Sequence, residues 1–286
     1  MPKIEMINQE IERVALGIGI PSCPAILLEL TEETKKEEPD FVKVEKLVSM
    51  DVGLSATLLK TINSPFYGLR NKVSSVKQAV GLLGLSMLCS TVSGLVLRNV
   101  FSGNDQVSME RFWDSSAKFA MTAMFLAKNI SGLNKEDAYT YGLFQNCGIP
   151  ILIQRYPDYK GTLDKANNSS EQKFTEVEDD AHGTDHVTMG YLMTKSWHLP
   201  EATTDAVRYH HEYTMLSDSQ AEISTSSKNM IALGLLADRS VHLGLGEGKN
   251  FSLEWSKGGE LALAQLGLSE TDFTDICDDI VDLIEA

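Results

Sequence analysis

The chain has 286 residues, of which 43% are hydrophobic and 23% are charged, and its formal net charge is −15. This composition is that of an ordinary globular protein of one large or two smaller domains, which excludes collagen-like and intrinsically disordered chains. Residues 1–105 carry 11 Lys+Arg against 12 Asp+Glu, whereas residues 106–286 carry 14 against 28. Because like charges repel, the acidic half is not expected to bind a phosphate backbone, and no direct nucleic-acid partner is predicted.

The four cysteines lie far apart and form no C-x-x-C pair, so neither a zinc knuckle nor a redox motif is predicted. Their use as small apolar residues, together with a first segment that lacks the apolar core of a signal peptide, favours a cytoplasmic location. The 19 uncharged residues 79–97 approach the length of a membrane span. Several glycine and serine residues lower the hydrophobicity of this run, and Gly84 offers a break, so we expect two buried helices and no span.

Apolar residues recur at helical spacing nearly throughout, and no alternating run makes a convincing strand, so we expect an all-α fold. Before residue 105 the expected helices are 4–14, 25–36, 41–50 behind an Asp40 cap, 54–62, 76–83 behind a Ser75 cap, and 85–101. Gly103-Asn104-Asp105 marks a joint between two lobes. After it the expected helices are 109–129, 135–156, 185–197, 200–212, 228–243 and a last one from Ser269, with 161–181 as a polar loop that contains short helical pieces.

Residues with the potential for metal chemistry gather in the second half of the chain. His186 begins one helix, His210 and His211 are adjacent near the end of another, and Asp238 lies in a third. Clusters of histidine and carboxylate side chains can bind metals. Adjacent residues on a helix point about 100° apart, so His210 and His211 converge only where the helix end bends. Two interpretations stay open: the histidines form hydrogen bonds in or beside the core, or they form a residual three-histidine site.

Several segments in order resemble a known superfamily. Asp185-His186-Val187-Thr188-Met189-Gly190, Trp197-His198-Leu199-Pro200 and Arg208-Tyr209-His210-His211 resemble the later part of HD-superfamily metal-dependent phosphohydrolases. Residues 63–69 followed by 73–84 resemble the HDOD branch of that superfamily. This resemblance implies a single HDOD-like unit over 1–286, with an N-terminal helical lobe (1–105), a degenerate HD-type lobe (106–248) and C-terminal helices (249–286).

The catalytic pattern of that superfamily fails at three positions. By resemblance, a working member has histidine at 115 and the His-Asp pair at 145–146, where this chain has Ser115, Gln145 and Asn146. Asp238 is the counterpart of the distal aspartate. A neutral amide at 146 supplies no charge to hold a divalent ion and its activating water. We therefore expect no enzyme activity, no cofactor and no bound metal, with His186, His210, His211 and Asp238 as vestigial candidates.

The resemblance implies a role in bacterial signalling, often beside cyclic-dinucleotide circuits. The expected function is a non-catalytic regulatory module that contacts another signalling protein. Two alternatives are a module that binds a nucleotide without hydrolysis, and a phosphohydrolase with a rearranged site.

The segment 63–78 is the expected working surface. No acidic residue occurs from Val52 to Asn104, which is the one long stretch of opposite sign in this acidic chain. Ser74 and Ser75 lie at a helix start, where backbone N–H groups attract anions. The candidates for binding a partner or an anion are Asn63, Ser64, Tyr67, Arg70, Lys72, Ser74 and Ser75. The alternative is that the loop plugs into the core and its basic residues are only solvated.

Overall fold

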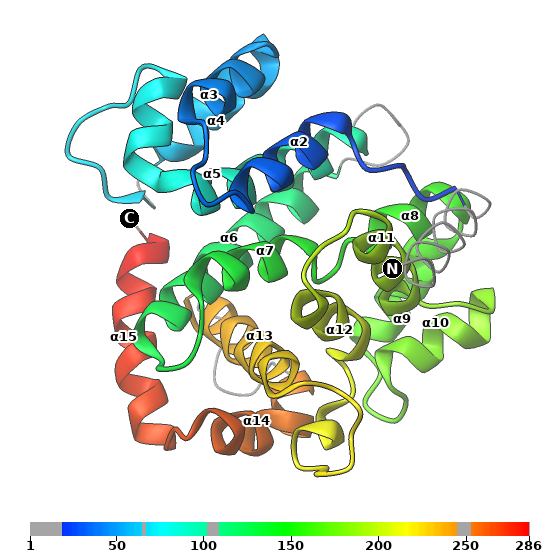
Figure 1. The fold of residues 1–286 in the computed structure, drawn as a ribbon. Coiled ribbons are helices and arrows are strands. Elements are labelled where there is room, and N and C mark those ends of the chain that lie inside the picture. The colour runs from blue at the N-terminus through cyan, green and yellow to red at the C-terminus, as the bar shows by residue number, and fades with distance from the viewer. Residues whose placement is uncertain (1–18, 65–66, 102–108, 245–252, 286) are drawn as a thin grey trace. The chain divides into compact units, whose positions relative to one another are not determined.

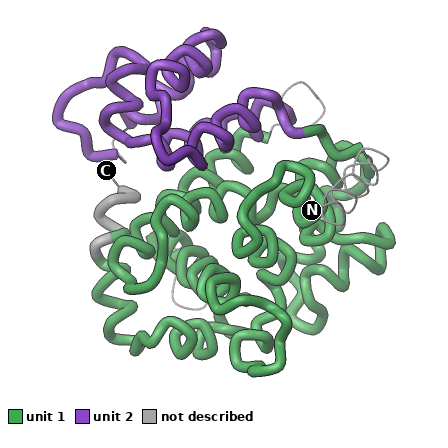
Figure 2. Tube along the Cα trace, viewed as in Figure 1, with its two compact units in different colours: residues 1–22, 104–285 green, residues 23–103, 286 purple. Residues whose placement is uncertain are grey.

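The computed structural model describes residues 19–64, 67–101, 109–244 and 253–285, and the helix expected at 4–14 lies outside these ranges. The described residues form helices and no strand, so the expected all-α fold is confirmed. The chain divides into two compact units, residues 23–103 and residues 1–22 with 104–285 (Figure 2).

The smaller unit, residues 23–103, is built from α2 to α5 (Figure 1). Its helices are α2 (Ala25–Thr34), α3 (Phe41–Ser49), α4 (Val52–Ile62) and α5 (Val76–Val100). The expected caps form: the Asp40 carboxylate accepts from two amides at the start of α3, and Ser75 Oγ accepts from Gln78 N at the start of α5. Each such cap stabilises its helix by about 1 kcal/mol. These caps fix where the chain turns between helices.

Helix α5 contains the apolar run 79–97. Gly84 lies inside it at φ 70°, ψ 173°, so the helix is kinked where the sequence predicted a break. A positive φ of this kind is open to glycine without steric cost. By length and composition alone α5 could cross a membrane, a test that core helices also pass. It packs on α2, α3 and α4, with Val80, Leu88 and Val92 buried, as expected of a core helix.

The larger unit is a helical bundle around α13 (Figure 1). Its elements are α6 (Glu110–Asn129), α7 (Lys135–Phe144), α8 (Gly148–Arg155), α9 (Tyr159–Asn167), α10 (Phe174–His182), α11 (His186–Ser196), α12 (Glu201–Tyr209), the 3-10 helix η2 (Tyr213–Leu216), α13 (Thr225–Gly244), α14 (Leu253–Leu266) and α15 (Glu270–Glu285). Helix α13 contacts α6, α7, α12, α14 and α15. Its residues 230–237 are all buried, which makes it the central helix of this unit.

Two expectations about helices in this unit are wrong. The helix expected at 135–156 is two helices, α7 and α8, separated by residues 145–147. Gly148 lies so close to the backbone of His186 and Gly190 that any side chain there would clash, so α8 begins tight against α11. The polar segment 161–181 is mostly helical, as α9 and α10, because Val177 and Ala166 each bury an apolar face.

The start of the chain also differs from the expected lobe 1–105. Residues 19–22 group with the larger unit. Ile20 is buried, and the carbonyl of Pro21 accepts a hydrogen bond of 3.0 Å from Trp197 Nε1. These contacts tie the segment before α2 to the end of α11.

Candidate functional site

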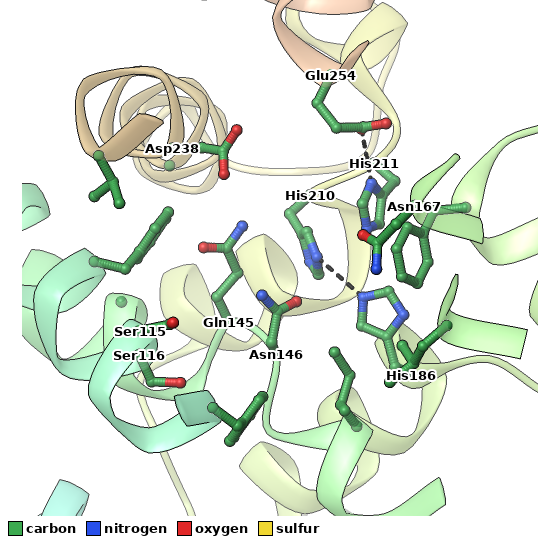
Figure 3. Close-up of a pocket in the computed structure, with 18 of the residues that line it drawn as sticks. Ser115, Ser116, Gln145, Asn146, Asn167, His186, His210, His211, Asp238 and Glu254 are labelled. Atoms are coloured by element: carbon green, nitrogen blue, oxygen red, sulfur yellow. Dashed lines mark hydrogen bonds and ion pairs between the residues drawn. The ribbon is translucent and has the colours of Figure 1, made fainter. Parts of the chain in front are cut away.

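A cavity of about 640 Å³ lies within the larger unit. All seven residues that the sequence singled out in this half line it: Ser115, Gln145, Asn146, His186, His210, His211 and Asp238 (Figure 3). They come from α6, the turn between α7 and α8, the start of α11, the end of α12, and α13. The fold therefore brings together positions that are more than 120 residues apart in the chain.

One wall of the cavity carries the three neutral residues. Ser115 is on α6, and Gln145 and Asn146 form the break between α7 and α8. Gln145 Oε1 is buried and has no hydrogen-bond partner among the described residues. Asp238 faces the same space from α13, and its Oδ1 lies 3.5 Å from His242 Nδ1. The positions where the sequence lacks metal ligands thus share one cavity, as a metal centre would require.

The opposite wall carries the three histidines. His186 begins α11, while His210 and His211 follow the end of α12 at Tyr209. Because α12 ends there, the two adjacent rings are not held at the helical angle, and Figure 3 shows all three rings turned toward one another. One ring nitrogen from each lies within 4.8 Å of the others, and Nε2 of His186 is 3.2 Å from Nε2 of His210.

Each histidine is oriented through its Nδ1 atom. His186 Nδ1 is 2.6 Å from Glu178 Oε2, and His211 Nδ1 is 2.9 Å from Glu254 Oε2. His210 Nδ1 is 2.8 Å from the carbonyl oxygen of Val207. A carbonyl or carboxylate oxygen accepts, so Nδ1 is the donor in each ring, and Nε2 is left to face the cluster.

Glu178 is a buried carboxylate, 0% exposed, behind this cluster. It accepts hydrogen bonds from the Tyr159 hydroxyl and from the His186 backbone amide and ring. Burial alone would raise its pKa, but the interactions with His186 and the Tyr159 hydroxyl outweigh burial and lower the pKa below its ordinary value. Glu178 is therefore ionised, and Tyr159 and His186 fix its position.

His210 is the most enclosed ring. Its burial, followed by the nearby His211 and His186, holds the pKa of His210 well below its ordinary value. The ring is therefore neutral at physiological pH. Glu254, on α14, accepts from His211, from the Tyr213 hydroxyl at 2.7 Å and from Lys257 Nζ at 2.8 Å. Burial opposes ionisation of Glu254, yet these partners lower its pKa below its usual range.

Sequence reasoning missed Glu178, Tyr159 and Glu254. Glu178 on α10 lies within the segment expected to be a loop, and Tyr159 on α9 lies beside it. Glu254 is 43 residues from the histidine that it contacts. The spacing of Glu178 to His186, eight residues across a helix break at Gly183, is the one local signal that could have linked them.

The expected working surface, residues 63–78, lies in the smaller unit. Arg70 and Lys72 are exposed. The Asn63 amide instead ties the loop to itself, since Nδ2 donates to the carbonyls of Leu59 and Val73 and Oδ1 accepts from Val73 N.

Other polar groups of this loop also have partners within the unit. Ser74 N donates to Gln78 Oε1, and Ser75 Oγ caps α5. Tyr67 OH lies 3.4 Å from Thr91 Oγ1, and the carbonyl of Ser64 accepts from Tyr67 N. Arg70, Lys72 and Lys77 are exposed and present positive charge outward.

Comparison with known proteins adds the family. The HDOD domain family matches residues 20–213, well over half of the chain. The chain belongs to the HDOD domain family. With the family come the HD-type helical fold and the signalling-related branch of the HD superfamily that the sequence motifs indicated.

Individual relatives of this HDOD domain are distant. An uncharacterized protein of Treponema pallidum (strain Nichols) is 26% identical over 221 residues, which are 74% of this chain and 42% of that protein. The cyclic di-GMP phosphodiesterase CdgJ of Vibrio cholerae is 28% identical over 139 residues, 46% of this chain and 31% of that protein. The chain thus spans less than half the length of these two relatives.

Among solved structures, an HDOD domain protein of unknown function from Geobacter sulfurreducens has the same fold. Its TM-score is 0.71 at 22% identity, over 98% of this chain and 97% of that one.

Proposed function

We propose that this HDOD domain is a non-catalytic regulatory module of a bacterial, cytoplasmic signal-transduction pathway that acts through protein–protein contacts. The observation that carries the proposal is the break between α7 and α8. It presents two neutral amides, Gln145 and Asn146, to the cavity that Asp238 also lines. Hydrolysis of a phosphodiester at neutral pH needs a metal-activated water, and a divalent ion there needs carboxylate or imidazole ligands.

The test is hydrolysis by the purified protein. Cyclic dinucleotides, nucleotides and a generic phosphodiester are supplied with manganese, nickel or iron, beside an Asp238→Ala variant. We expect the same background rate in both proteins. Turnover by the wild type that is lost in the variant would refute the proposal and favour the alternative of a phosphohydrolase with a rearranged site.

The partner surface is proposed to be residues 63–78. Its support is the exposure of Arg70 and Lys72 on a stretch without acidic residues, in a chain of net charge −15. An acidic surface of another signalling protein complements this charge and would speed its association. The hydrogen bonds that Asn63 and Ser75 make within the unit would then hold the loop in shape, and these two side chains would not contact the partner.

A second candidate function is nucleotide binding without hydrolysis. The cavity volume of about 640 Å³ is typical of small-molecule sites. Phe112 and Phe119 supply apolar surface, and Gln145 and Asn146 supply amide donors and acceptors that can pair with a base edge. Isothermal titration with cyclic dinucleotides tests it. Binding lost in Gln145→Ala with Asn146→Ala would favour this candidate, and absence of binding to any nucleotide would remove it.

A further inference from the structure

A groove of about 490 Å³ lies within the smaller unit, between α2, α3 with the turn that leads into α4, and the end of α5. Its apolar lining consists of Ile26, Leu47, Met50, Leu54, Val96 and Val100. We propose that this groove binds one amphipathic helix of a partner protein, with an apolar stripe that lysine or arginine residues border. The inference goes beyond the proposed function, because it concerns another surface and a partner segment of opposite charge.

The smaller unit presents most of the exposed apolar side chains of the described chain. Of the seven large apolar side chains that are exposed among the described residues, six lie in this unit. Met50, which lines the groove, is 74% exposed, and Val52, two residues later, is 80% exposed. Single exposed apolar residues are ordinary, whereas apolar residues gathered at a groove mark sites of protein contact. Methionine is common on such surfaces because its unbranched side chain adapts to a partner.

The groove has a buried apolar floor and an open mouth. Leu54 and Val96 are buried, whereas Met50, Asp51 and Asn99 are exposed. Small-molecule sites bury about 70–90% of their ligand, and an open mouth would leave much of a small ligand in water. An open apolar groove instead fits an occupant that has one apolar face and one polar face.

The walls of the groove favour a helix over an extended peptide. They are helical, and the described residues contain no strand whose edge could pair with an extended segment. An extended peptide would therefore place its backbone N–H and C=O groups against apolar walls without partners. A helix pairs its own backbone groups, and its apolar residues at positions i, i+3, i+4 and i+7 can enter such a groove.

The charge around the groove decides the kind of helix. Glu29 and Asp51 are the two ionisable residues that line it, and both are acidic. Asp51 caps α4 by accepting from Leu54 N at 2.9 Å, whereas the Glu29 carboxylate forms no hydrogen bond or ion pair with any described residue. A lysine or arginine beside the apolar stripe would be attracted to these carboxylates, and an acidic residue there would be repelled. The groove therefore favours a basic amphipathic helix.

The same charges disfavour the chain's own segments as occupants. Residues 1–18 carry three acidic residues against two basic ones. The segment that follows is tied to the larger unit through the buried Ile20 and the carbonyl of Pro21. A second copy of the chain brings a net charge of −15, and its amphipathic helix α15 has seven acidic residues and no basic one. Neither supplies a basic flank, so the occupant is a segment of another protein.

The test is fluorescence anisotropy with the full chain and a labelled, designed peptide of about 18 residues, which is about five helical turns. The peptide has leucine at the i, i+3, i+4 and i+7 positions and lysine on both flanks. A second peptide has glutamate in place of each lysine. A third has the composition of the first in scrambled order and measures general attraction to an acidic protein. We expect saturable binding of one Lys-flanked peptide per chain, and binding at least about tenfold weaker for the other two.

Variants of the chain locate the binding. Met50→Glu should weaken it by at least about tenfold, because a carboxylate would then meet the apolar stripe without a partner. Leu82→Glu is the matched control, since Leu82 is 50% exposed on the same unit and does not line the groove. It should bind as the wild type does, and circular dichroism checks that both variants fold. Glu29→Lys should weaken binding of the Lys-flanked peptide and strengthen that of the Glu-flanked one, and added salt should reduce both effects.

The proposal is overturned by absence of saturable binding, by equal binding of the scrambled peptide, or by equal binding to Met50→Glu and Leu82→Glu. Two further results would assign the groove to this chain itself and overturn it as well. Tighter peptide binding by Ile7→Glu with Ile11→Glu would show that residues 1–18 occupy the groove. A dimer in light scattering that Met50→Glu dissociates would show that a second copy does. We expect neither result.

Discussion

Removal of the Glu178 side chain should destabilise the larger unit strongly. Glu178 is 0% exposed and its carboxylate accepts from the Tyr159 hydroxyl, from His186 N at 3.1 Å and from His186 Nδ1 at 2.6 Å. Glu178→Ala leaves those donors buried without an acceptor. Breaking a buried ionic pair by removing one partner costs about 3–5 kcal/mol. In Tyr159→Phe one hydrogen bond to the charged group is lost, which costs about 1.5–3 kcal/mol.

The assay is thermal unfolding followed by circular dichroism, in chelator so that metal loading does not contribute. For a unit of this size, 1 kcal/mol shifts the melting temperature by about 2–4 °C, so Glu178→Ala should melt about 6–20 °C below the wild type. Asp179→Ala is the matched control, because it removes an exposed carboxylate from the next position of α10. Its effect should stay within about 0.5 kcal/mol. A Glu178→Ala melting temperature equal to that of Asp179→Ala would refute the stabilising role of the buried hydrogen bonds among Tyr159, Glu178 and His186.

Further predictions concern other parts of the molecule. Truncation after Leu268 removes α15, on which Phe273, Cys277 and Ile280 are buried. It should lower the melting temperature, because burial of each large apolar side chain contributes about 1.5–3 kcal/mol. An unchanged melting temperature would show that α15 does not pack on the core. Arg70→Glu with Lys72→Glu should leave folding unchanged and abolish capture of a signalling partner. The control Lys118→Glu with Lys165→Glu makes the same change in charge at other exposed positions and should leave capture intact. Equal capture by both double variants would refute the proposed partner surface. Hydrogen bonds from Lys36 and from the Asp40 backbone lower the pKa of Glu33 to about 2. The ionised Glu33 should therefore stabilise the smaller unit above about pH 4.5, and this stabilisation should be lost as the pH falls toward 2. Acid titration of Glu33→Gln, monitored by circular dichroism, should therefore show a smaller loss of stability over this range, and curves of identical shape would contradict the assignment.

Much of the fold follows from local patterns in the sequence. The caps Asp40 and Ser75 and the break at Gly84 form as expected, because each depends on residues a few positions apart. Asp185 and Ser269 form further caps of the same local kind. Helix α15 packs by one face, on which Phe273 and Ile280 are buried and Ile276 is partly buried. The break between α7 and α8 was missed because its cause is a contact with α11, some 40 residues away.

The sequence indicated residues that line the cavity, but it did not indicate the carboxylates that orient them. The sequence order of motifs placed Ser115, Gln145 and Asp238 around one space, and the cavity contains them. The hydrogen bonds that orient His186 and His211 depend on Glu178 and Glu254, which reach the cluster through tertiary packing. No helical period or spacing rule connects Glu254 on α14 to the end of α12.

The most direct test of the central claim is hydrolysis with the protein in molar excess over a labelled cyclic dinucleotide, after loading with zinc or manganese. With protein in excess, a single slow hydrolysis of each substrate molecule is visible, so weak activity cannot be hidden by poor affinity. We expect the substrate to be recovered intact, with the same background rate that is found for Asp238→Ala. Conversion to a linear product by the wild type, and not by Asp238→Ala, would contradict it.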